Sequence, residues 1–132
     1  MQVKKILLVD DEPLVRRSLE KTLLRAGFDV DTAADVNQGL DLFKEAETNL
    51  VPFDMAVLDI NMPDFDGIER SGAGLDLLSK IKEIRQDVHI IMLTAYDEVN
   101  KAKDAVNRGA KAYFVKGREQ GLVELINETF ES

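Results

Sequence analysis

Acidic, hydroxyl and amine side chains stand directly after short apolar runs at four places in the chain. Asp10 and Asp11 follow the first run, and Asp59 follows another. Thr94 follows a third run, and Lys116 follows a fourth. If these runs are parallel strands, their carboxyl ends meet at the edge of the sheet where open α/β folds bind ligands. The pattern therefore predicts three carboxylates, a hydroxyl and an amine gathered at one site.

Such a group of side chains is suited to phosphoryl transfer with a divalent metal. Neighbouring carboxylates repel one another, so at least one pKa should rise, and a hard cation such as Mg²⁺ or Mn²⁺ relieves the repulsion. A carboxylate can also act as a nucleophile and form an aspartyl-phosphate. Charge on the phosphoryl oxygens would be met by the metal, by Lys116, and by the Thr94 hydroxyl with a backbone N–H. Each residue alone is more often a helix cap, a strand residue or a surface lysine, so the prediction depends on their combination.

Five apolar runs alternate with five amphipathic stretches, which predicts a βα unit repeated five times around a parallel sheet. The predicted strands cover residues 6–9, 30–33, 55–58, 90–93 and 112–115. The second and last runs are partly polar, as expected at sheet edges, whereas the others are continuous apolar runs typical of buried parallel strands. We therefore expect one α/β domain over residues 1–132, with a flavodoxin-like, doubly wound, five-stranded sheet in the order 2-1-3-4-5.

Apolar residues at helical spacing predict the five helices. The first begins at Pro13 and ends at Gly27, and the second follows an N-capping Asp35. The fourth ends at Gly109 and has the narrowest apolar stripe, so it should be the easiest helix to move. The residues predicted on the buried stripes are Val15, Leu19, Leu23, Ala26, Val36, Leu40, Phe43, Leu77, Leu78, Ile81, Ile84, Val99, Ala102, Val106, Leu122, Ile126 and Phe130.

The composition is that of a globular protein without a broad nucleic-acid surface. The 132 residues include 17 basic and 25 acidic side chains, for a net charge of −8, whereas nucleic-acid binding needs a basic face. No cysteine is present, which excludes a disulfide framework and a thiolate metal site. The first apolar run is too short for a signal peptide or a membrane span. We expect a cytoplasmic protein without direct nucleic-acid binding or membrane insertion.

Four segments together resemble the receiver domain of two-component response regulators, of the chemotaxis-regulator type. They are Leu-Leu-Val-Asp-Asp-Glu at 7–12, Val-Leu-Asp-Ile-Asn-Met-Pro at 57–63, Met-Leu-Thr-Ala at 92–95 and Gly-Ala-Lys-Ala-Tyr-Phe-Val-Lys at 109–116. The resemblance covers nearly the whole chain. It implies a bacterial phosphorelay switch with autophosphorylation and autodephosphorylation chemistry, not a classical enzyme. A sensor histidine kinase, a phosphotransfer protein or a small phosphodonor would supply the phosphoryl group.

The resemblance also assigns roles to the residues at the expected site. Asp59 would be the phosphoacceptor of a phosphoprotein. Asp11, Asp59 and the backbone carbonyl of Asn61 would hold Mg²⁺, and Asp10 would act mainly through water. A downstream output domain or protein would respond to phosphorylation, and a phosphorylation-dependent dimer is compatible with the family.

The switch and the lysine are assigned in the same way, with one departure from the family pattern. Thr94 and Tyr113 would form the switch pair, and Lys116 would contact a phosphoryl oxygen. In the family a proline with a cis bond normally follows the lysine. Gly117 stands there in this chain, and a cis bond without proline is costly, so we expect the lysine to be placed differently.

A second departure is the segment from Asp64 to Gly74, which is longer than the family's usual loop. It contains several glycines and lies next to Asp59 in the expected fold. One interpretation is an inert solvent loop. The other is a flap over Asp59, with the planar guanidinium of Arg70 in reach of a phosphoryl oxygen.

Two more titratable residues are expected to have structural roles only. Glu12 should lie in the first turn of the first helix, where the helix dipole favours acidic residues. His89, the only histidine, should pack at the start of the fourth strand.

Other classes of protein fit the sequence less well. A flavodoxin would need a phosphate loop rich in backbone donors after the first strand, where acidic residues 10–12 would repel phosphate. An EF-hand-like calcium loop starting at Asp59 fails because Pro63 occupies a ligand position. A phosphatase with an aspartate nucleophile would carry two aspartates separated by one residue after the first strand, whereas Asp10 and Asp11 are adjacent and Asp59 follows another strand. The alternative that stays open is a receiver-like interaction module that is not phosphorylated in vivo.

Overall fold

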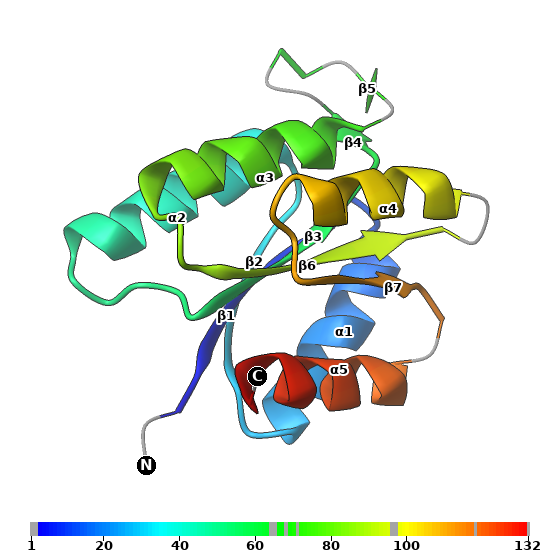
Figure 1. Cartoon of the computed structure of the whole chain (residues 1–132). Coiled ribbons are helices and arrows are strands. Elements are labelled where there is room, and N and C mark those ends of the chain that lie inside the picture. The colour runs from blue at the N-terminus through cyan, green and yellow to red at the C-terminus, as the bar shows by residue number, and fades with distance from the viewer. Residues whose placement is uncertain are drawn as a thin grey trace.

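The computed structural model describes residues 3–63, 66–67, 69–70, 72–95, 98–117 and 119–131. Five parallel strands form one sheet in the order β2-β1-β3-β6-β7 (Figure 1). They are β1 (Lys5–Val9), β2 (Asp29–Ala33), β3 (Met55–Asp59), β6 (His89–Thr94) and β7 (Ala112–Val115). Counted along the chain without the short ribbon of β4 and β5, this order is 2-1-3-4-5. The predicted topology is confirmed.

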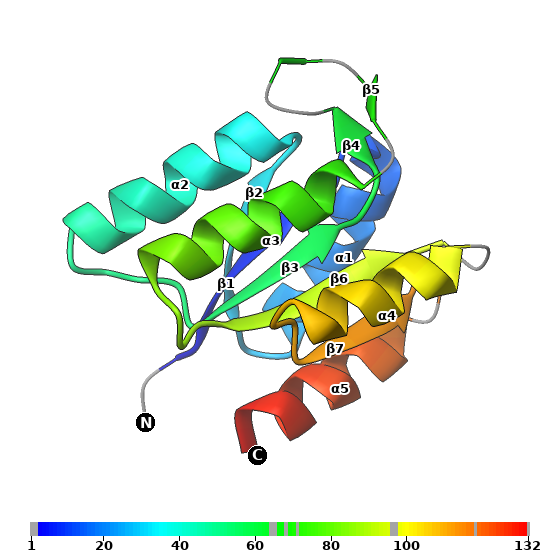
Figure 2. The same ribbon diagram turned by 45° about the horizontal axis from the view of Figure 1, so that its top comes forward.

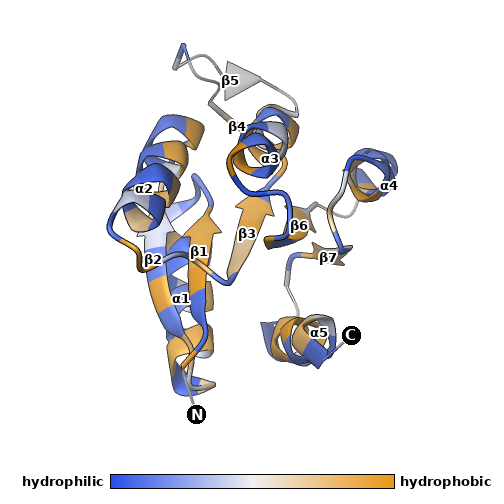
Figure 3. Cartoon of the chain, turned by 60° about the vertical axis from the view of Figure 1, so that its left-hand side comes forward, coloured by the Kyte–Doolittle hydropathy of each residue, from blue (hydrophilic) through white to orange (hydrophobic). Residues whose placement is uncertain are grey.

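The described residues form five helices, which cover both faces of the sheet. They are α1 (Pro13–Arg25), α2 (Val36–Thr48), α3 (Ala73–Ile84), α4 (Val99–Asn107) and α5 (Glu119–Glu131). The helices α1 and α5 lie on one face, and α2, α3 and α4 lie on the other (Figure 1, Figure 3). After β1, the chain adds β2 on one side of that strand and then β3, β6 and β7 on the other side. None of the described helices has the length and apolar composition needed to cross a membrane.

Two apolar clusters fill the space on either side of the sheet, because successive strand residues point to opposite faces. In β1, Leu7 and Val9 belong to the cluster under α2 and α3, whereas Ile6 and Leu8 belong to the cluster under α1 and α5. Every residue of β3 is buried, but β2 alternates between exposed and buried positions. The strongly apolar β1 and β3 stand out in Figure 3. The central strands are thus covered on both faces, as predicted.

The predicted helix ends agree with the structure. Pro13 is the first residue of α1, and the Asp35 side chain caps α2 by accepting a hydrogen bond from Gln38 N–H at 2.8 Å. Gly27 follows α1 with a φ of 96°, and Gly109 follows α4 with a φ of 115°. Both glycines have a left-handed conformation that ends a helix without steric cost.

Three residues predicted on the buried stripes are exposed, so those predictions are wrong. Ala26 and Ile84 lie at the C-terminal ends of α1 and α3, beyond the last buried residue of each helix. Val106 is 39% exposed because α4 packs through the small side chains of Ala102 and Ala105. The apolar stripes in the sequence are therefore longer than the packed surface of the helices.

Part of the segment predicted as an irregular loop forms a ribbon. The strand β4 (Met62–Pro63) pairs antiparallel with β5 (Glu69–Arg70). The ribbon projects from the body of the domain near the start of α3 (Figure 2). Asp64 and the side chain of Arg70 lie outside what the structure describes.

The segment also ends earlier than predicted, because α3 begins at Ala73 and includes Gly74 in its first turn. A Cβ atom on Gly74 would lie 1.9 Å from the carbonyl oxygen of Asp59. Only a residue without a side chain allows such a close approach of two main chains. The first turn of α3 is thereby pressed against the end of β3.

Candidate functional site

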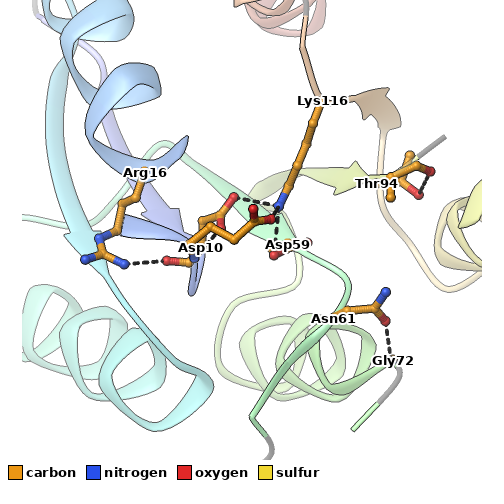
Figure 4. Close-up of polar contacts among 9 residues, drawn as sticks. Asp10, Arg16, Asp59, Asn61, Gly72, Thr94 and Lys116 are labelled. Atoms are coloured by element: carbon orange, nitrogen blue, oxygen red, sulfur yellow. Dashed lines mark hydrogen bonds and ion pairs between the residues drawn. The ribbon is translucent and has the colours of Figure 1, made fainter. Parts of the chain in front are cut away.

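The ends of β1, β3 and β7 place the predicted acids and the lysine at one edge of the sheet (Figure 4). Asp10 follows β1 and Asp59 ends β3, and they are neighbours because the residues before them are paired in register. The Lys116 ammonium lies 3.0 Å from Asp10 Oδ2 and 3.0 Å from Asp59 Oδ2. Four residues each offer a carboxylate oxygen within 4.8 Å of the others: Asp10, Asp11, Glu12 and Asp59.

Asp10 is fully buried, and its contacts fix its position. Its Oδ1 accepts a hydrogen bond from Glu12 N–H at 2.9 Å, and its carbonyl accepts one from Arg16 Nη1 at 2.8 Å. Its Oδ2 makes an ion pair with Lys116 but has no well-aligned hydrogen bond among the described residues. Arg16, in the first turns of α1, therefore holds the main chain of Asp10 in place. This role of Arg16 was not predicted.

Burial and like charges change the protonation equilibria of the site. Burial raises the pKa of Asp59 to about 7, repulsion from Asp10 adds to this rise, and Lys116 opposes it. Burial also raises the pKa of Asp10, against the effect of its hydrogen bond from Glu12 N–H and its contact with Lys116. These are the directions expected where carboxylates crowd together without enough positive charge.

The lysine responds in the opposite direction. Burial acts to lower the pKa of Lys116, but the hydrogen bond to Glu12 and the charges of Asp59 and Asp10 outweigh it. The net result is a pKa above the ordinary lysine value, so the ammonium stays charged. One cation therefore faces several acids.

Glu12 belongs to the site, and the prediction of a purely helical role is wrong. The helix α1 begins one residue later, and Glu12 occupies the N-cap position without a side-chain capping bond. Its Oε1 instead accepts a hydrogen bond from Lys116 at 2.8 Å. The physical reason is Pro13, which lacks an N–H and fits the first helical position. Glu12 is left in extended conformation before the helix, with its side chain free to reach the lysine.

Thr94 and Tyr113 lie on the α4 side of the site. Thr94 is buried at the end of β6, and its hydroxyl donates to the Ala95 carbonyl at 3.0 Å. Figure 4 shows this side chain apart from the carboxylates. Tyr113 is half-buried and packs against the cluster under α2, α3 and α4. It is paired with Met92, two residues before Thr94, so the two predicted switch residues share one face of the sheet.

Asn61 connects the site to two helices through its side chain. Its Oδ1 accepts a hydrogen bond from the N–H of Gly72, the N-cap residue of α3, at 3.0 Å. Its side chain also hydrogen-bonds Glu98, the residue before α4. Hydrogen bonds from Lys101 and Asn61 lower the pKa of the Glu98 carboxyl. This link between three distant segments was not predicted, because nothing in the local sequence marks it.

The lysine reaches the acids although glycine follows it. The N–H of Lys116 donates to the Thr94 carbonyl at 2.9 Å, and Gly117 has a φ of 111°. No peptide bond among the described residues is cis. The Lys116 ammonium nevertheless lies 3.0 Å from Asp59 Oδ2.

His89 has the packing role that was predicted. It lies at the start of β6, and its ring meets the Phe130 ring edge to face at 5.6 Å. Burial lowers the pKa of its imidazole, and the nearby Lys111, Lys82 and Lys4 act in the same direction. His89 is at the opposite end of β6 from Thr94 and the acidic site.

Comparison with known proteins identifies this arrangement. A family model described as the response regulator receiver domain matches residues 6–127. The chain belongs to the response regulator receiver family. The predicted resemblance is confirmed, and receiver domains are signalling switches rather than classical enzymes.

Individual receiver relatives resemble the chain over most of its length. Chemotaxis protein CheY of Bacillus subtilis is 33% identical over 127 residues, which are 95% of this chain and 96% of that protein. The probable transcriptional regulator ycf27 of Porphyridium aerugineum is 41% identical over 118 residues, 88% of this chain but 43% of that protein. The chain thus spans less than half the length of that regulator. Response regulator protein TrrA of Thermotoga maritima, solved in complex with Mg²⁺-BeF, has a TM-score of 0.78 and 33% identity, over 96% of this chain and 99% of that chain.

Proposed function

We propose that this receiver domain accepts a phosphoryl group on Asp59 with Mg²⁺ and switches its binding to partner proteins. The observation that carries the proposal is the buried Asp59 carboxylate, whose Oδ2 lies 3.0 Å from the Lys116 ammonium within a group of four acids. A carboxylate can form an acyl phosphate, and a fixed cation beside it can neutralise the charge that arrives with the phosphoryl group.

In the proposed reaction, an oxygen of the Asp59 carboxylate attacks the phosphorus atom of the donor. The bond between phosphorus and the leaving group of the donor breaks, and the leaving group departs opposite Asp59. The donor is a phosphohistidine of a sensor kinase or phosphotransfer protein, or a small acyl phosphate or phosphoramidate. Lys116 pairs with one phosphoryl oxygen, and the Thr94 hydroxyl turns from Ala95 toward another.

The acidic group fits a hard divalent cation. It offers carboxylate oxygens, which Mg²⁺ and Mn²⁺ prefer, and Asp10 Oδ2 is buried without a well-aligned hydrogen bond from the residues that the structure describes. Asp11, Asp59 and the Asn61 carbonyl would hold the ion, and Asp10 would act through water. When bound, the ion supplies positive charge to the acids and to the phosphoryl oxygens. The Mg²⁺-BeF complex of the related TrrA supports this assignment.

The switch extends from Thr94 to the surface formed by α4, β7 and α5. A phosphoryl group on Asp59 would draw the Thr94 hydroxyl inward and favour an inward Tyr113, because the two residues share one face of the sheet. An output domain, an output protein or a second copy of the chain would recognise the changed surface. We place this switch in the bacterial cytoplasm, with residues 1–132 acting as one domain.

Intact mass spectrometry after incubation with acetyl phosphate or phosphoramidate and Mg²⁺ tests the proposal. The wild type should gain the mass of one phosphoryl group, and Asp59→Asn should gain none. Asp41→Asn, at an exposed position on α2, serves as the control and should behave like the wild type. Phosphorylation of Asp59→Asn would place the acceptor elsewhere. No phosphorylation of the folded wild type by either donor would favour the alternative of an unphosphorylated interaction module.

A further inference from the structure

The turn that carries Lys116 receives little support from packing at its centre. Gly117 has a φ of 111°, and apart from its chain neighbours no atom of the described residues lies within 4 Å of the position that a Cβ would take. A cavity of about 230 Å³ lies between this turn and α1, lined by Leu14, Lys116 and Gly117 among others. A glycine with open space around it has a wide choice of main-chain conformations. Other contacts must therefore fix where the lysine points.

Two hydrogen-bonded anchors hold the ends of the turn. On the strand side, the N–H of Lys116 donates to the Thr94 carbonyl at 2.9 Å. On the helix side, Glu119 is the first residue of α5, and its Oε2 accepts a hydrogen bond from Thr22 Oγ1 at 2.8 Å. Its Oε1 accepts a second hydrogen bond from Ser18 Oγ. Both hydroxyls belong to α1, so we call these two bonds the α1–Glu119 clasp.

The clasp connects the lysine to the same helix that positions the acids. Helix α1 begins at Pro13, directly after the acidic residues 10–12. Arg16 on this helix also holds the Asp10 carbonyl. The turn of Lys116 and the acidic segment are therefore both tied to α1. A shift of α5 relative to α1 would move the lysine relative to Asp59.

We propose that Glu119, held by Ser18 and Thr22, is a positioning residue that sets the place of Lys116 for phosphoryl transfer to Asp59. The inference rests on the proposed function. Glu119 acts through the lysine and does not touch the reacting atoms. A misplacement of about 1 Å can cost on the order of 100-fold in rate. Loss of the clasp leaves the strand-side anchor of Lys116 in place, so we expect a smaller effect, a phosphorylation rate roughly tenfold lower.

The test compares variants that break the clasp from either side. Glu119→Ala removes the acceptor, and the pair Ser18→Ala with Thr22→Val removes both donors. Glu119→Gln is the conservative variant, since its amide can still pair with both hydroxyls. Glu131→Ala, an exposed position at the other end of α5, is the matched control. The phosphorylation rate is measured by intact mass at saturating Mg²⁺ over a range of acetyl phosphate concentrations.

Both clasp variants should react about tenfold more slowly, with the donor concentration at half-maximal rate unchanged, because the loss is in orientation and not in binding. Glu119→Gln should recover most of the rate, and Glu131→Ala should match the wild type. In a Lys116→Ala background, Glu119→Ala should cause no further loss. The proposal would be overturned if folded Glu119→Ala reacted at the wild-type rate. It would also be overturned if Glu119→Ala slowed phosphorylation as much in the Lys116→Ala background as in the wild type.

A second readout does not require phosphorylation. The NMR signal of the Lys116 ammonium reports its contact with the acids in the unphosphorylated protein. Glu119→Ala should shift this signal toward the position of a solvent-exposed lysine, and Glu119→Gln should not. An unchanged Lys116 signal in Glu119→Ala would contradict the positioning role. If the wild type takes up no phosphoryl group but Glu119→Ala still shifts the Lys116 signal, the proposed function is rejected and the positioning role of Glu119 is not.

Discussion

Removal of the Asp59 carboxylate should stabilise the metal-free protein at neutral pH. Burial and the charge of Asp10 raise the pKa of Asp59 from 3.8 to about 7. The folded state therefore holds this proton more tightly than the unfolded state does. Ionised Asp59 is unfavourable in the fold, and the Asp59→Asn substitution removes that cost because it puts a neutral amide in place of the carboxylate. Lys116 keeps two of its three acidic partners in the variant, Asp10 and Glu12.

The size and the pH range of the effect follow from the two pKa values. A difference between 3.8 and about 7, at 1.36 kcal/mol for each pKa unit, corresponds to roughly 4 kcal/mol. A raised carboxyl pKa costs nothing below the unfolded value, where both states are protonated. The cost grows between about pH 4 and pH 7 and is complete above the folded value. The advantage of Asp59→Asn over the wild type should therefore be small near pH 4 and reach a few kcal/mol at pH 8.

Urea unfolding in the presence of a chelator, followed from pH 4 to pH 8, measures this difference. Asp41→Asn removes an acid from an exposed site on α2 and controls for the change in net charge. It should follow the wild type at every pH. An Asp59→Asn variant no more stable than the wild type at pH 8 would refute the assigned electrostatics. So would an advantage that does not change with pH.

Three further predictions follow from the site and the ribbon. Mg²⁺ should raise the melting temperature of the wild type but hardly that of Asp11→Asn, which lacks a proposed ligand; equal shifts in thermal unfolding would place the ion elsewhere. Beryllofluoride with Mg²⁺ should alter hydrogen exchange within residues 94–117, and unchanged exchange there would contradict the proposed switch. Replacing residues 64–68 by Asn-Gly joins Pro63 to Glu69 through a two-residue hairpin turn. If the ribbon is a flap over Asp59, the lifetime of the aspartyl-phosphate should change several-fold in this variant. An unchanged lifetime in the folded variant would show that the ribbon has no role in the chemistry at Asp59.

The sheet and the core of the site were predictable because burial constrains them directly. Continuous apolar runs indicated strands covered on both faces, and polar edges fixed the order of the strands. Once that order was set, the positions of Asp10, Asp59 and Lys116 at one edge followed from the direction of parallel strands. The three residues indeed meet within hydrogen-bond or ion-pair distance.

The remaining contacts were not predictable because they join residues far apart in the sequence. Glu12 and Lys116 are separated by 104 positions, and Thr22 and Glu119 by 97. Such pairs depend on the final placement of long side chains and produce no periodic pattern. The ribbon escaped prediction for a different reason, since strands of two residues are too short to alternate recognisably.

The close approach of Gly74 to Asp59 determines where the chain tolerates a change in length. The N–H of Gly74 donates to the Ile60 carbonyl at 2.7 Å, and a side chain there would overlap the Asp59 carbonyl. Just before it, Gly72 is anchored to Asn61. The two ends of the ribbon are thus pinned independently of what lies between them. A change in length between Pro63 and Glu69 should therefore leave the Asp59 main chain where it is, and a reporter peptide inserted there should leave the domain folded.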